Sequence, residues 1–321
     1  MLNGGKMQNT KIRVLMCDDD PADRSLVRQL LKLSPKFEAE LIEVEDGAEL
    51  AEKLDTEEVD VILLDIQLPG KSGLEWLREV KAAEKAPVIM ATGHGDEMVA
   101  VEAMKAGASD YLPKSQFSAS SLTRSISNVI EKWELENTVK KFRKELVVMA
   151  TTDELTGLLN RRSLMDAIKQ QFGSAQKDGR PFVLVMLDID HFKRVNDTYG
   201  HDVGDLVLVG VCRTVEKAVR PGDSFGRYGG EEFIIVLKSG AVEDAVAVAE
   251  QCRRLVEEAV FAGRDGTGIK VTVSLGVAAC SGDAVSYEEA IKRADTMLYK
   301  AKESGRNRVE TWDCAVLAKA S

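Results

Sequence analysis

Two groups of acidic residues in this chain occupy positions where carboxylates can hold metal ions. The first group is Asp18, Asp19 and Asp65, which lie at the ends of apolar runs typical of buried strands. Carboxylates gathered at strand ends repel one another at low dielectric constant, and a hard cation such as Mg²⁺ relieves that repulsion. Beside such a cation Asp65 can act as a nucleophile towards phosphorus. Thr92 and Lys114 end or follow two later apolar runs, where a hydroxyl and a positive charge can contact the phosphoryl group.

The second acidic group centres on the segment RYGGEEF, residues 227–233. Asp188 lies near the end of the apolar run FVLVMLDID, and the two glycines before Glu231 and Glu232 predict a hairpin turn. If the hairpin lies beside that run, Asp188 and Glu231 converge. Two carboxylates and a backbone carbonyl can hold one or two Mg²⁺ ions, and thereby a triphosphate.

Four further polar residues suit a nucleotide. Lys302 and Arg306 are four residues apart on a predicted helix, so they face the same way and can grip phosphates. Asn196 and Asp205 offer an amide and a carboxylate, which match the acceptor and the donors on a guanine edge better than those of adenine.

The elements that must position the first group alternate between strands and amphipathic helices. The predicted strands cover residues 11–17, 39–44, 59–65, 86–92 and 109–113. Continuous apolar strands that alternate with helices indicate a doubly wound, five-stranded parallel sheet covered on both faces. Ligands bind at the carboxyl ends of the strands in that architecture, where the three aspartates fall.

Residues 118–150 contain no Gly or Pro and predict one long helix. Its later half has an apolar seam with 4, 3, 4, 3 spacing, formed by Leu135, Val139, Phe142, Leu146 and Met149. This spacing favours a dimeric coiled coil, with packing of the helix on its own domain as the alternative. An earlier apolar set, one residue out of phase, is Ile126, Val129 and Trp133. The slip between the two sets is a candidate bistable element.

The remaining chain predicts an α+β domain rather than a second parallel sheet. A buried strand over 182–190, the hairpin around 227–233 and a strand over 270–278 are interspersed with three amphipathic helical segments. Mixed runs of this kind, with an antiparallel hairpin, are typical of α+β folds.

Composition excludes several classes of protein. With a net charge of −10 over 321 residues and a pI near 5.1, the chain is unsuited to non-specific binding of DNA or of anionic membranes. No apolar run reaches the length of a membrane span, and residues 1–11 lack the apolar core of a signal peptide. The five cysteines are scattered and odd in number, which predicts a reduced, cytoplasmic protein.

The motifs VLMCDDD, LLDIQLPGKSG, MATGH and GASDYLPK, over residues 10–127, resemble the receiver domain of two-component response regulators. The resemblance implies that Asp65 is the phosphoacceptor and that a histidine kinase is the phosphodonor. It also implies a Mg²⁺ site and a phosphate-sensing switch. The implied metal ligands are Asp18, Asp19, Asp65 and the Gln67 carbonyl, and the implied switch residues are Thr92, Tyr111 and Lys114.

After a coiled-coil linker over 128–150, residues 151–313 resemble the GGDEF family of diguanylate cyclases. The motifs are DELTGLLNRR, LDIDHFKRVNDTYGHDVGD, RYGGEEF, VTVSLGVA and ADTMLYKAKESGRN. The resemblance implies a cyclase-like domain with a central, mostly antiparallel sheet. It further implies that two GTP become cyclic di-GMP and two pyrophosphates in a homodimer, because each domain holds one GTP.

The same resemblance assigns the individual residues. Asp188, the Ile189 carbonyl and Glu231 would hold Mg²⁺, with Mn²⁺ as an alternative, and Glu232 would lie near a second metal or the ribose 3′-hydroxyl. Gly229 and Gly230 would make room for the nucleotide. The remaining contacts to GTP would come from Phe192, Lys193, Asn196, Asp205, Lys302 and Arg306. Phe192 is equally expected as a core aromatic.

The segment RPGD, residues 220–223, precedes the first glycine of RYGGEEF by five residues and resembles the RxxD inhibitory site of the family. Arg220 and Asp223 would then bind the product, whereas the plain alternative is a Pro–Gly turn with a solvated ion pair. Gln251 stands where many members carry a helper arginine, with Arg253 nearby. Two other hypotheses stay open: a catalytically inactive response regulator that senses cyclic di-GMP, and a scaffold that only dimerises.

Overall fold

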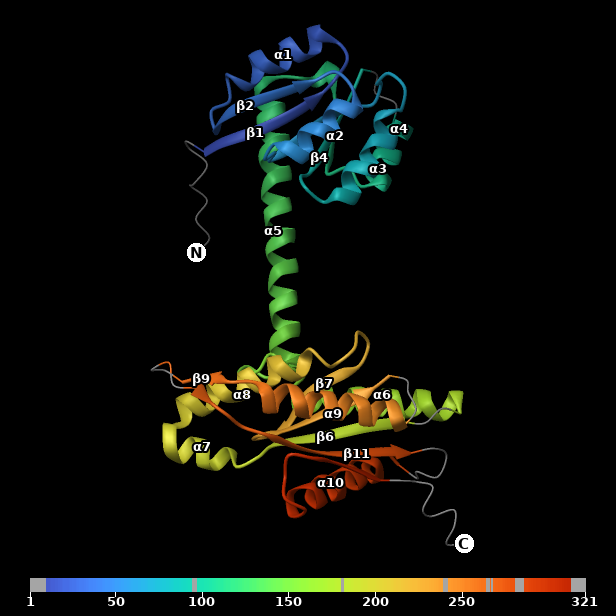
Figure 1. Ribbon diagram of the computed structural model, residues 1–321. Coiled ribbons are helices and arrows are strands. Elements are labelled where there is room, and N and C mark those ends of the chain that lie inside the picture. The colour runs from blue at the N-terminus through green and yellow to red at the C-terminus, as the bar shows by residue number, and fades with distance from the viewer. Residues whose placement is uncertain are drawn as a thin grey trace. The chain divides into compact units, whose positions relative to one another are not determined.

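A computed structural model describes residues 10–93, 97–179, 182–238, 242–263, 266, 268–280 and 286–312. The chain divides into two compact units, Met1–Arg143 and Lys144–Ser321, and each is described by itself. Figure 1 labels the helices and strands.

The first unit is built on a five-stranded parallel sheet with the strand order β2-β1-β3-β4-β5 (Figure 1). Its strands are β1 (Thr10–Cys17), β2 (Phe37–Val44), β3 (Val61–Asp65), β4 (Val88–Thr92) and β5 (Asp110–Pro113). Its helices are α1 (Pro21–Leu31), α2 (Gly47–Thr56), α3 (Gly73–Ala83), α4 (Glu97–Ala106) and α5 (Ala119–Thr151), and a 3₁₀ turn, η1, covers Lys114–Gln116.

Helices cover both faces of this sheet, as the alternating sequence pattern predicts. Every residue of β3 and β4 is buried. One apolar cluster joins the sheet to α1 and α5 through side chains such as Val27 and Leu122, and another joins it to α2 and α3 through Leu50 and Leu77. The doubly wound parallel fold is therefore confirmed, and it brings the carboxyl ends of β1, β3 and β4 to one edge.

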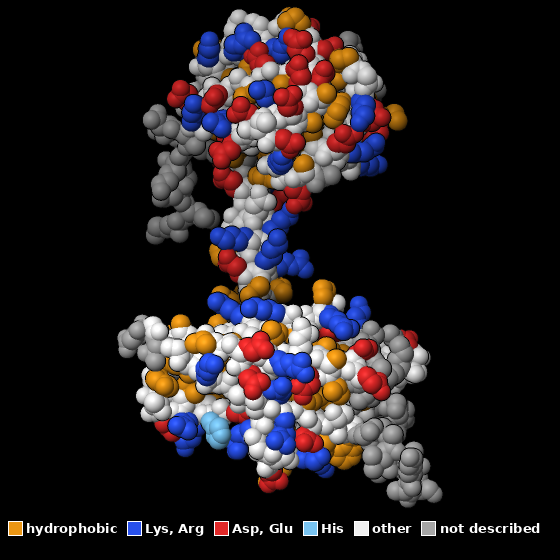
Figure 2. Space-filling model, in the orientation of Figure 1, with side chains coloured by type: hydrophobic (Ala, Val, Ile, Leu, Met, Phe, Trp, Pro, Cys, Tyr) orange, Lys and Arg blue, Asp and Glu red, His pale blue; other side chains and the backbone are white. Residues whose placement is uncertain are grey.

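Helix α5 changes character along its length. Its first turns are buried in the core of the first unit, where Leu122 and Ile126 are fully covered and Val129 is nearly so. The later seam is exposed: Leu135, Val139, Phe142, Leu146 and Met149 have relative exposures between 57% and 70%. Figure 2 shows hydrophobic side chains on the surface of this helix. The earlier apolar set thus reflects core packing, and the change of phase marks the point where the helix leaves that core.

The second unit has a five-stranded sheet in the order β12-β11-β6-β8-β7, in which only the β11–β12 pair is parallel (Figure 1). Its strands are β6 (Phe182–Ile189), β7 (Ser224–Gly229), β8 (Glu232–Leu237), β11 (Val273–Cys280) and β12 (Val309–Trp312), and β9 (Phe261–Ala262) pairs with β10 (Gly268–Ile269). Its helices are α6 (Arg161–Asp178), α7 (Phe192–Tyr199), α8 (His201–Glu216), α9 (Val242–Glu258) and α10 (Tyr287–Glu303).

Strand β6 is central and buried along its whole length. Alternate side chains contribute to two apolar clusters, because successive residues of a strand point to opposite faces. Val183 and Val185 join the cluster with α8 and α9, whereas Leu184 and Met186 join the one with α6 and α10. Asp188 and Glu232 pair across β6 and β8, so the packing of apolar residues sets the register of the acidic ones.

Candidate functional sites

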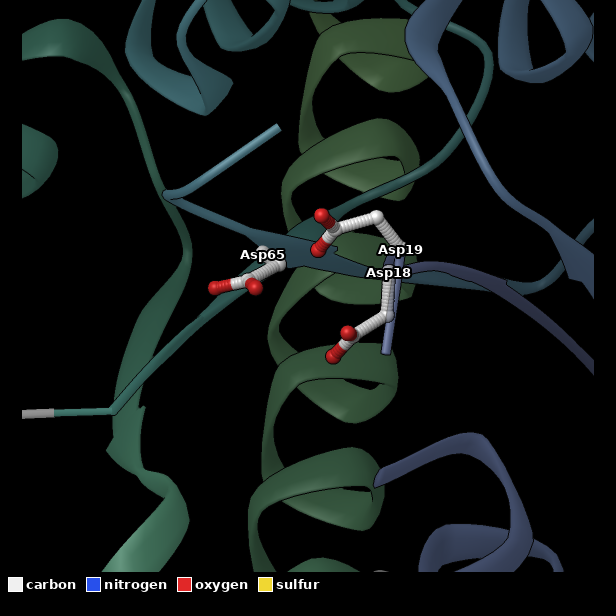
Figure 3. Close-up of side chains that lie close together, drawn as sticks. All are labelled: Asp18, Asp19 and Asp65. Carbon is white, nitrogen blue, oxygen red and sulfur yellow. The ribbon is translucent and has the colours of Figure 1, made fainter. Parts of the chain in front are cut away.

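Three carboxylates gather at one edge of the first sheet. Asp18 directly follows β1, Asp19 is the next residue, and Asp65 is the last residue of β3. One oxygen from each lies within 4.8 Å of the others, as Figure 3 illustrates. Asp18 and Asp65 are buried and Asp19 is exposed, so the cluster is open to solvent on one side.

Lys114 is the cation of this cluster, and three carboxylates share it. Its Nζ atom lies 2.9 Å from Asp18 Oδ2, 2.8 Å from Asp65 Oδ2 and 2.7 Å from Asp23 Oδ2. Burial alone would lower the Lys114 pKa, but the three acidic partners outweigh burial and raise it. The sequence predicts only that Lys114 lies where it can contact a phosphoryl group on Asp65. Asp23, on α1, is a partner that sequence reasoning missed.

Backbone and side-chain donors hold Asp18 in place. Asp18 Oδ1 accepts a hydrogen bond from the Asp20 amide at 3.0 Å, and Asp20 in turn caps α1. The Arg24 guanidinium is buried, donates to the Asp18 carbonyl at 2.6 Å and pairs with Glu45. Burial raises the pKa of Asp18, against the opposing contact with Lys114. The Asp20 amide and the Arg24 guanidinium therefore hold Asp18 in position.

The predicted switch residues also meet. The Thr92 and Tyr111 hydroxyls lie 3.1 Å apart across the neighbouring strands β4 and β5. Gln67 is two residues beyond the end of β3 and is exposed. The Thr92–Tyr111 pair and Gln67 therefore lie at the edge of the sheet where β3 ends at Asp65.

The acidic cluster fits Mg²⁺ by the chemistry of its donors. Oxygen ligands are what Mg²⁺ prefers, and Asp18, Asp19, Asp23 and Asp65 carry more negative charge than Lys114 balances. Among the residues that the structure describes, the buried Asp65 Oδ1 atom has no hydrogen-bond partner. Because a buried oxygen without a partner costs free energy, a cation bound to Asp65 Oδ1 would be favourable.

Asp188 is the centre of the second site. It is 5% exposed, lies opposite Glu232 on β8, and its Oδ2 atom is 2.7 Å from Lys302 Nζ. The turn between β7 and β8 contains Glu231, whose carbonyl accepts from the Ile189 amide at 3.4 Å. The hairpin predicted from the two glycines is thus present beside β6, and the acidic turn lies next to Asp188.

The electrostatics of this site suit a cation. The Asp188 pKa is raised from 3.8 to about 6: burial raises it most, Lys302 lowers it, and the charges of Glu231 and Glu232 also raise it. Lys302 contacts Asp188 alone, while Glu231 and Glu232 act on Asp188 through their charge. The net negative charge suits a divalent cation, although among the described residues only the Asp18, Asp19 and Asp65 cluster brings its oxygens within ligand distance of one another.

Arg227 links the acidic turn to the beginning of the domain. Its Nε and Nη2 atoms donate to the Gly230 carbonyl at 2.9 and 2.8 Å, and its Nη1 atom lies 3.1 Å from both oxygens of Asp153. Asp153 also accepts from the amide and hydroxyl of Thr156. Sequence reasoning assigned no role to Arg227 or Asp153. Their membership of two of the quoted motifs was the available signal.

Asp190 is a second residue that sequence reasoning missed. It is buried, and its oxygens accept from the Thr272 and Ser274 hydroxyls at 2.7 Å and from the Asn307 amide at 3.0 Å. It therefore anchors the segment that follows α10. The prediction that Arg306 lies on that helix is wrong, since α10 ends at Glu303 and Arg306 adopts a left-handed conformation with φ of 60°.

The residues predicted to contact guanine lie on α7 and α8. Asn196 is half-buried and Asp205 is exposed. A Cβ atom at Gly204 would lie 1.8 Å from Asn196 Oδ1, so only glycine lets this amide approach α8 beside Asp205. Lys193 is exposed, whereas Phe192 is 6% exposed and belongs to the core, as one of its two expected roles requires. A Cβ atom at Gly230 would meet nothing within 4 Å, whereas one at Gly229 would lie 3.2 Å from Glu232 Oε2.

The segment RPGD forms a tight turn. The Asp223 amide donates to the Arg220 carbonyl, and Asp223 Oδ1 accepts from the Lys238 amide at 2.9 Å. Arg220 is exposed and forms no ion pair within the described ranges, so the solvated Arg220–Asp223 pair is not seen. Arg253 is paired with Glu250 and Glu257 and is not free to assist Arg220.

Comparisons with known proteins agree with this geometry. Residues 14–127 match the response regulator receiver domain, and residues 150–308 match the family described as diguanylate cyclase, GGDEF domain. The response regulator PleD of Caulobacter vibrioides is 32% identical over 255 residues, which cover 78% of this chain and 56% of PleD. Diguanylate cyclase A of Treponema denticola is 39% identical over 168 residues, or 51% of this chain and 45% of that protein.

One solved structure contains the coiled coil and GGDEF domain of DgcB from Caulobacter crescentus in complex with c-di-GMP. It superimposes with a TM-score of 0.54 at 30% identity, covering 58% of this chain and 98% of that chain. The fold and the acidic strand ends define a response regulator. More particularly, the chain belongs to the regulators in which a receiver domain is fused to a GGDEF domain. It spans about half the length of the curated relatives it matches.

None of the helices in the described part of the chain is long and apolar enough to cross a membrane.

Proposed function

We propose that this protein is a diguanylate cyclase that joins two GTP molecules into cyclic di-GMP and releases two pyrophosphates. The observation that carries the proposal is the group formed by Asp188, Glu232 and Lys302, in which a buried carboxylate lies between an acidic turn and an amine. A domain that only bound product would not need this group. The name of Diguanylate cyclase A, which is 39% identical over the domain, supports the same reaction.

The chain's own residues would bind and orient the substrate. Lys302 and Arg306 would contact the triphosphate, and Asn196 with Asp205 would select guanine through an amide and a carboxylate. Arg227 would keep the acidic turn in place through the Gly230 carbonyl. Mg²⁺ held by Asp188, the Ile189 carbonyl and Glu231 would neutralise phosphate oxygens and activate the 3′-hydroxyl, with Glu232 beside the second metal or that hydroxyl.

Each domain would bind one GTP. Two copies of the domain must therefore face each other, so that the 3′-hydroxyl of each GTP can attack the α-phosphate of the other GTP. The exposed seam of α5 supports this requirement, because five large apolar side chains at coiled-coil spacing are stabilised by covering them with a second copy. Holding both nucleotides in register accounts for much of the rate enhancement expected of such a site.

Phosphorylation would regulate the dimer. Asp65 would accept a phosphoryl group from a histidine kinase, with Mg²⁺ at Asp18, Asp19 and Gln67. Lys114 and Thr92 would then bind the phosphoryl oxygens, and Tyr111 would follow Thr92 because their hydroxyls are in contact. The receiver core that contains the first turns of α5 would repack and shift the population of dimer arrangements.

Product would inhibit the enzyme at the RPGD turn, where Arg220 is exposed and unpaired among the described residues. Arg253 is held by two glutamates, so we expect this site to work without a helper arginine from α9.

The test is to incubate the purified protein with GTP and Mg²⁺, with and without beryllofluoride as a phosphoryl mimic, and to measure cyclic di-GMP. We expect product, a change in its rate with the mimic in the wild type, and no such change in Asp65→Asn. Glu231→Gln should form no product while it keeps the wild-type circular dichroism spectrum. A folded wild-type protein that makes no product in either state would refute the cyclase and favour a sensor of cyclic di-GMP.

A further inference from the structure

A cavity of about 590 Å³ lies on the face of α7 that points away from the proposed GTP contacts. One wall is α7, the second is the end of α9, and the third is the stretch from β10 to β11; Figure 1 shows α7 at one end of the second unit. The cavity-lining residues of α7 are Arg194, Val195, Thr198 and Tyr199, and His191, the residue before the helix, also lines the cavity. Because a helix turns every 3.6 residues, Lys193 and Asn196 lie on the opposite face from Arg194, Val195 and Thr198.

The acidic groups of the cavity are already satisfied from within the protein. Asp190 accepts three hydrogen bonds, from two hydroxyls and a backbone amide. Glu257 accepts from Arg253 at 2.7 Å and from the Asn307 amide group at 2.7 Å. Neither carboxylate therefore needs a cation from solvent, and the cavity has little unused accepting capacity.

The basic groups of the cavity are not satisfied. Arg194 and Lys270 are exposed, and neither they nor His191 forms a side-chain hydrogen bond or ion pair with any residue for which the structure gives a placement. The Arg194 and Lys270 side chains can therefore donate hydrogen bonds to an anion, and the Arg194 guanidinium suits phosphate in particular.

The floor of the cavity is apolar and its size exceeds that of a bare anion. Val195, Ile269 and Val271 are buried beneath it, and the exposed Tyr199 ring lies at its rim. We propose that this cavity is a second ligand site, which binds a small phosphorylated molecule with an apolar or aromatic part, of the class of a nucleoside monophosphate. The phosphate would contact Arg194 and Lys270, and the ring would cover the apolar floor.

Occupancy would act on the neighbouring site through α7. This helix has only eight residues, and its other face carries Lys193 and Asn196. A ligand that stiffens or moves the helix would change the affinity for GTP, and by linkage GTP would change the affinity for the ligand by the same factor. This consequence rests on the proposed function; the ligand site itself does not.

The test is isothermal titration calorimetry of the full chain with adenosine monophosphate, and with uncharged adenosine in parallel. EDTA in the buffer suppresses metal-dependent binding at the proposed GTP site. We expect a dissociation constant below about 1 mM for the monophosphate. Adenosine should bind at least roughly tenfold more weakly, and Arg194→Gln and Lys270→Gln should each weaken monophosphate binding roughly tenfold.

Lys193→Gln is the matched control, because it removes a cation from the opposite face of the same helix. Monophosphate binding that is unchanged in this variant supports the cavity. The proposal is overturned if the monophosphate does not bind at millimolar concentration, if adenosine binds equally well, or if Lys193→Gln weakens binding as much as Arg194→Gln. None of these measurements requires turnover, so a failure of the cyclase proposal would be seen separately.

Discussion

Asp188→Asn should stabilise the second unit when no divalent metal is present. The folded protein raises the Asp188 pKa from 3.8 to about 6, mainly by burial, so the fold disfavours the charged form. This cost is absent below the unfolded pKa, grows as the pH rises from 3.8 to about 6, and is fully present above that range. At 1.36 kcal/mol per pKa unit, a shift of about two units corresponds to about 3 kcal/mol.

Replacement by asparagine removes the ionisation but keeps the shape of the side chain. Lys302 is 31% exposed, so its amine can turn to water once the carboxylate is gone. We therefore expect the variant to be more stable than the wild type by about 3 kcal/mol near pH 7.5 and by about 1 kcal/mol near pH 4.5. With a urea slope of about 1–3 kcal/mol/M, the higher value shifts the midpoint by about 1–3 M.

Tryptophan fluorescence can isolate the second unit. Trp76 and Trp133 lie in the first unit and Trp312 in the second, so a Trp76→Phe, Trp133→Phe background reports on the second unit alone. Urea melts in EDTA would compare Asp188→Asn with the wild type. Asp197→Asn, an exposed aspartate on α7, is the control and should change stability by less than about 0.5 kcal/mol.

Two results would refute the reasoning: an Asp188→Asn midpoint at or below that of the wild type near pH 7.5, or an advantage that does not depend on pH. Saturating Mg²⁺ should narrow the difference, because a metal that binds only the folded wild type adds to its stability.

Three further substitutions test other parts of the argument. Leu146→Asn in the exposed seam should weaken self-association at least tenfold in sedimentation, since burying a leucine contributes about 1.5–3 kcal/mol; an unchanged mass distribution would exclude the seam. Arg227→Ala should slow cyclic di-GMP formation by a factor of about 10–100, because two charge-assisted hydrogen bonds to the acidic turn are lost; an unchanged rate would show that the turn holds itself. Gly276→Ala should destabilise the second unit by about 3 kcal/mol in urea melts, because its Cβ would lie 2.2 Å from the Ala294 carbonyl and 2.3 Å from the Leu298 amide.

The sequence predicts the fold well where apolar periodicity is strong. The five parallel strands of the first unit begin and end within about two residues of their predicted limits, because buried strands are continuous apolar runs. The sequence pattern does not indicate strand β12, because VETW is short and half-buried and only its pairing with β11 makes it a strand. The division of α7 from α8 at Gly200 also depends on local backbone conformation that apolar spacing does not report.

The acidic centres of both sites follow from strand ends, which pattern alone can find. The residues around them do not. Asp23 contacts Lys114 across 91 positions of sequence, and Asp190 receives its three hydrogen bonds from residues more than 80 positions away. No local spacing encodes such contacts. The roles given to the individual nucleotide-binding residues remain predictions, and the apolar set at Ile126 and Val129 shows how core packing can resemble a seam.

The bridge from Asp153 through Arg227 to the Gly230 carbonyl bears on where the chain can be cut. Asp153 comes two residues after the end of α5, before any strand of the second sheet. A fragment that starts beyond it would keep every strand and helix of the catalytic half and yet lose the carboxylate that holds the arginine fork. Such a fragment should fold, but its acidic turn around Gly230 and Glu231 should be less ordered. The start of the smallest active fragment is therefore set by the Asp153–Arg227 ion pair rather than by the boundary of a helix or strand.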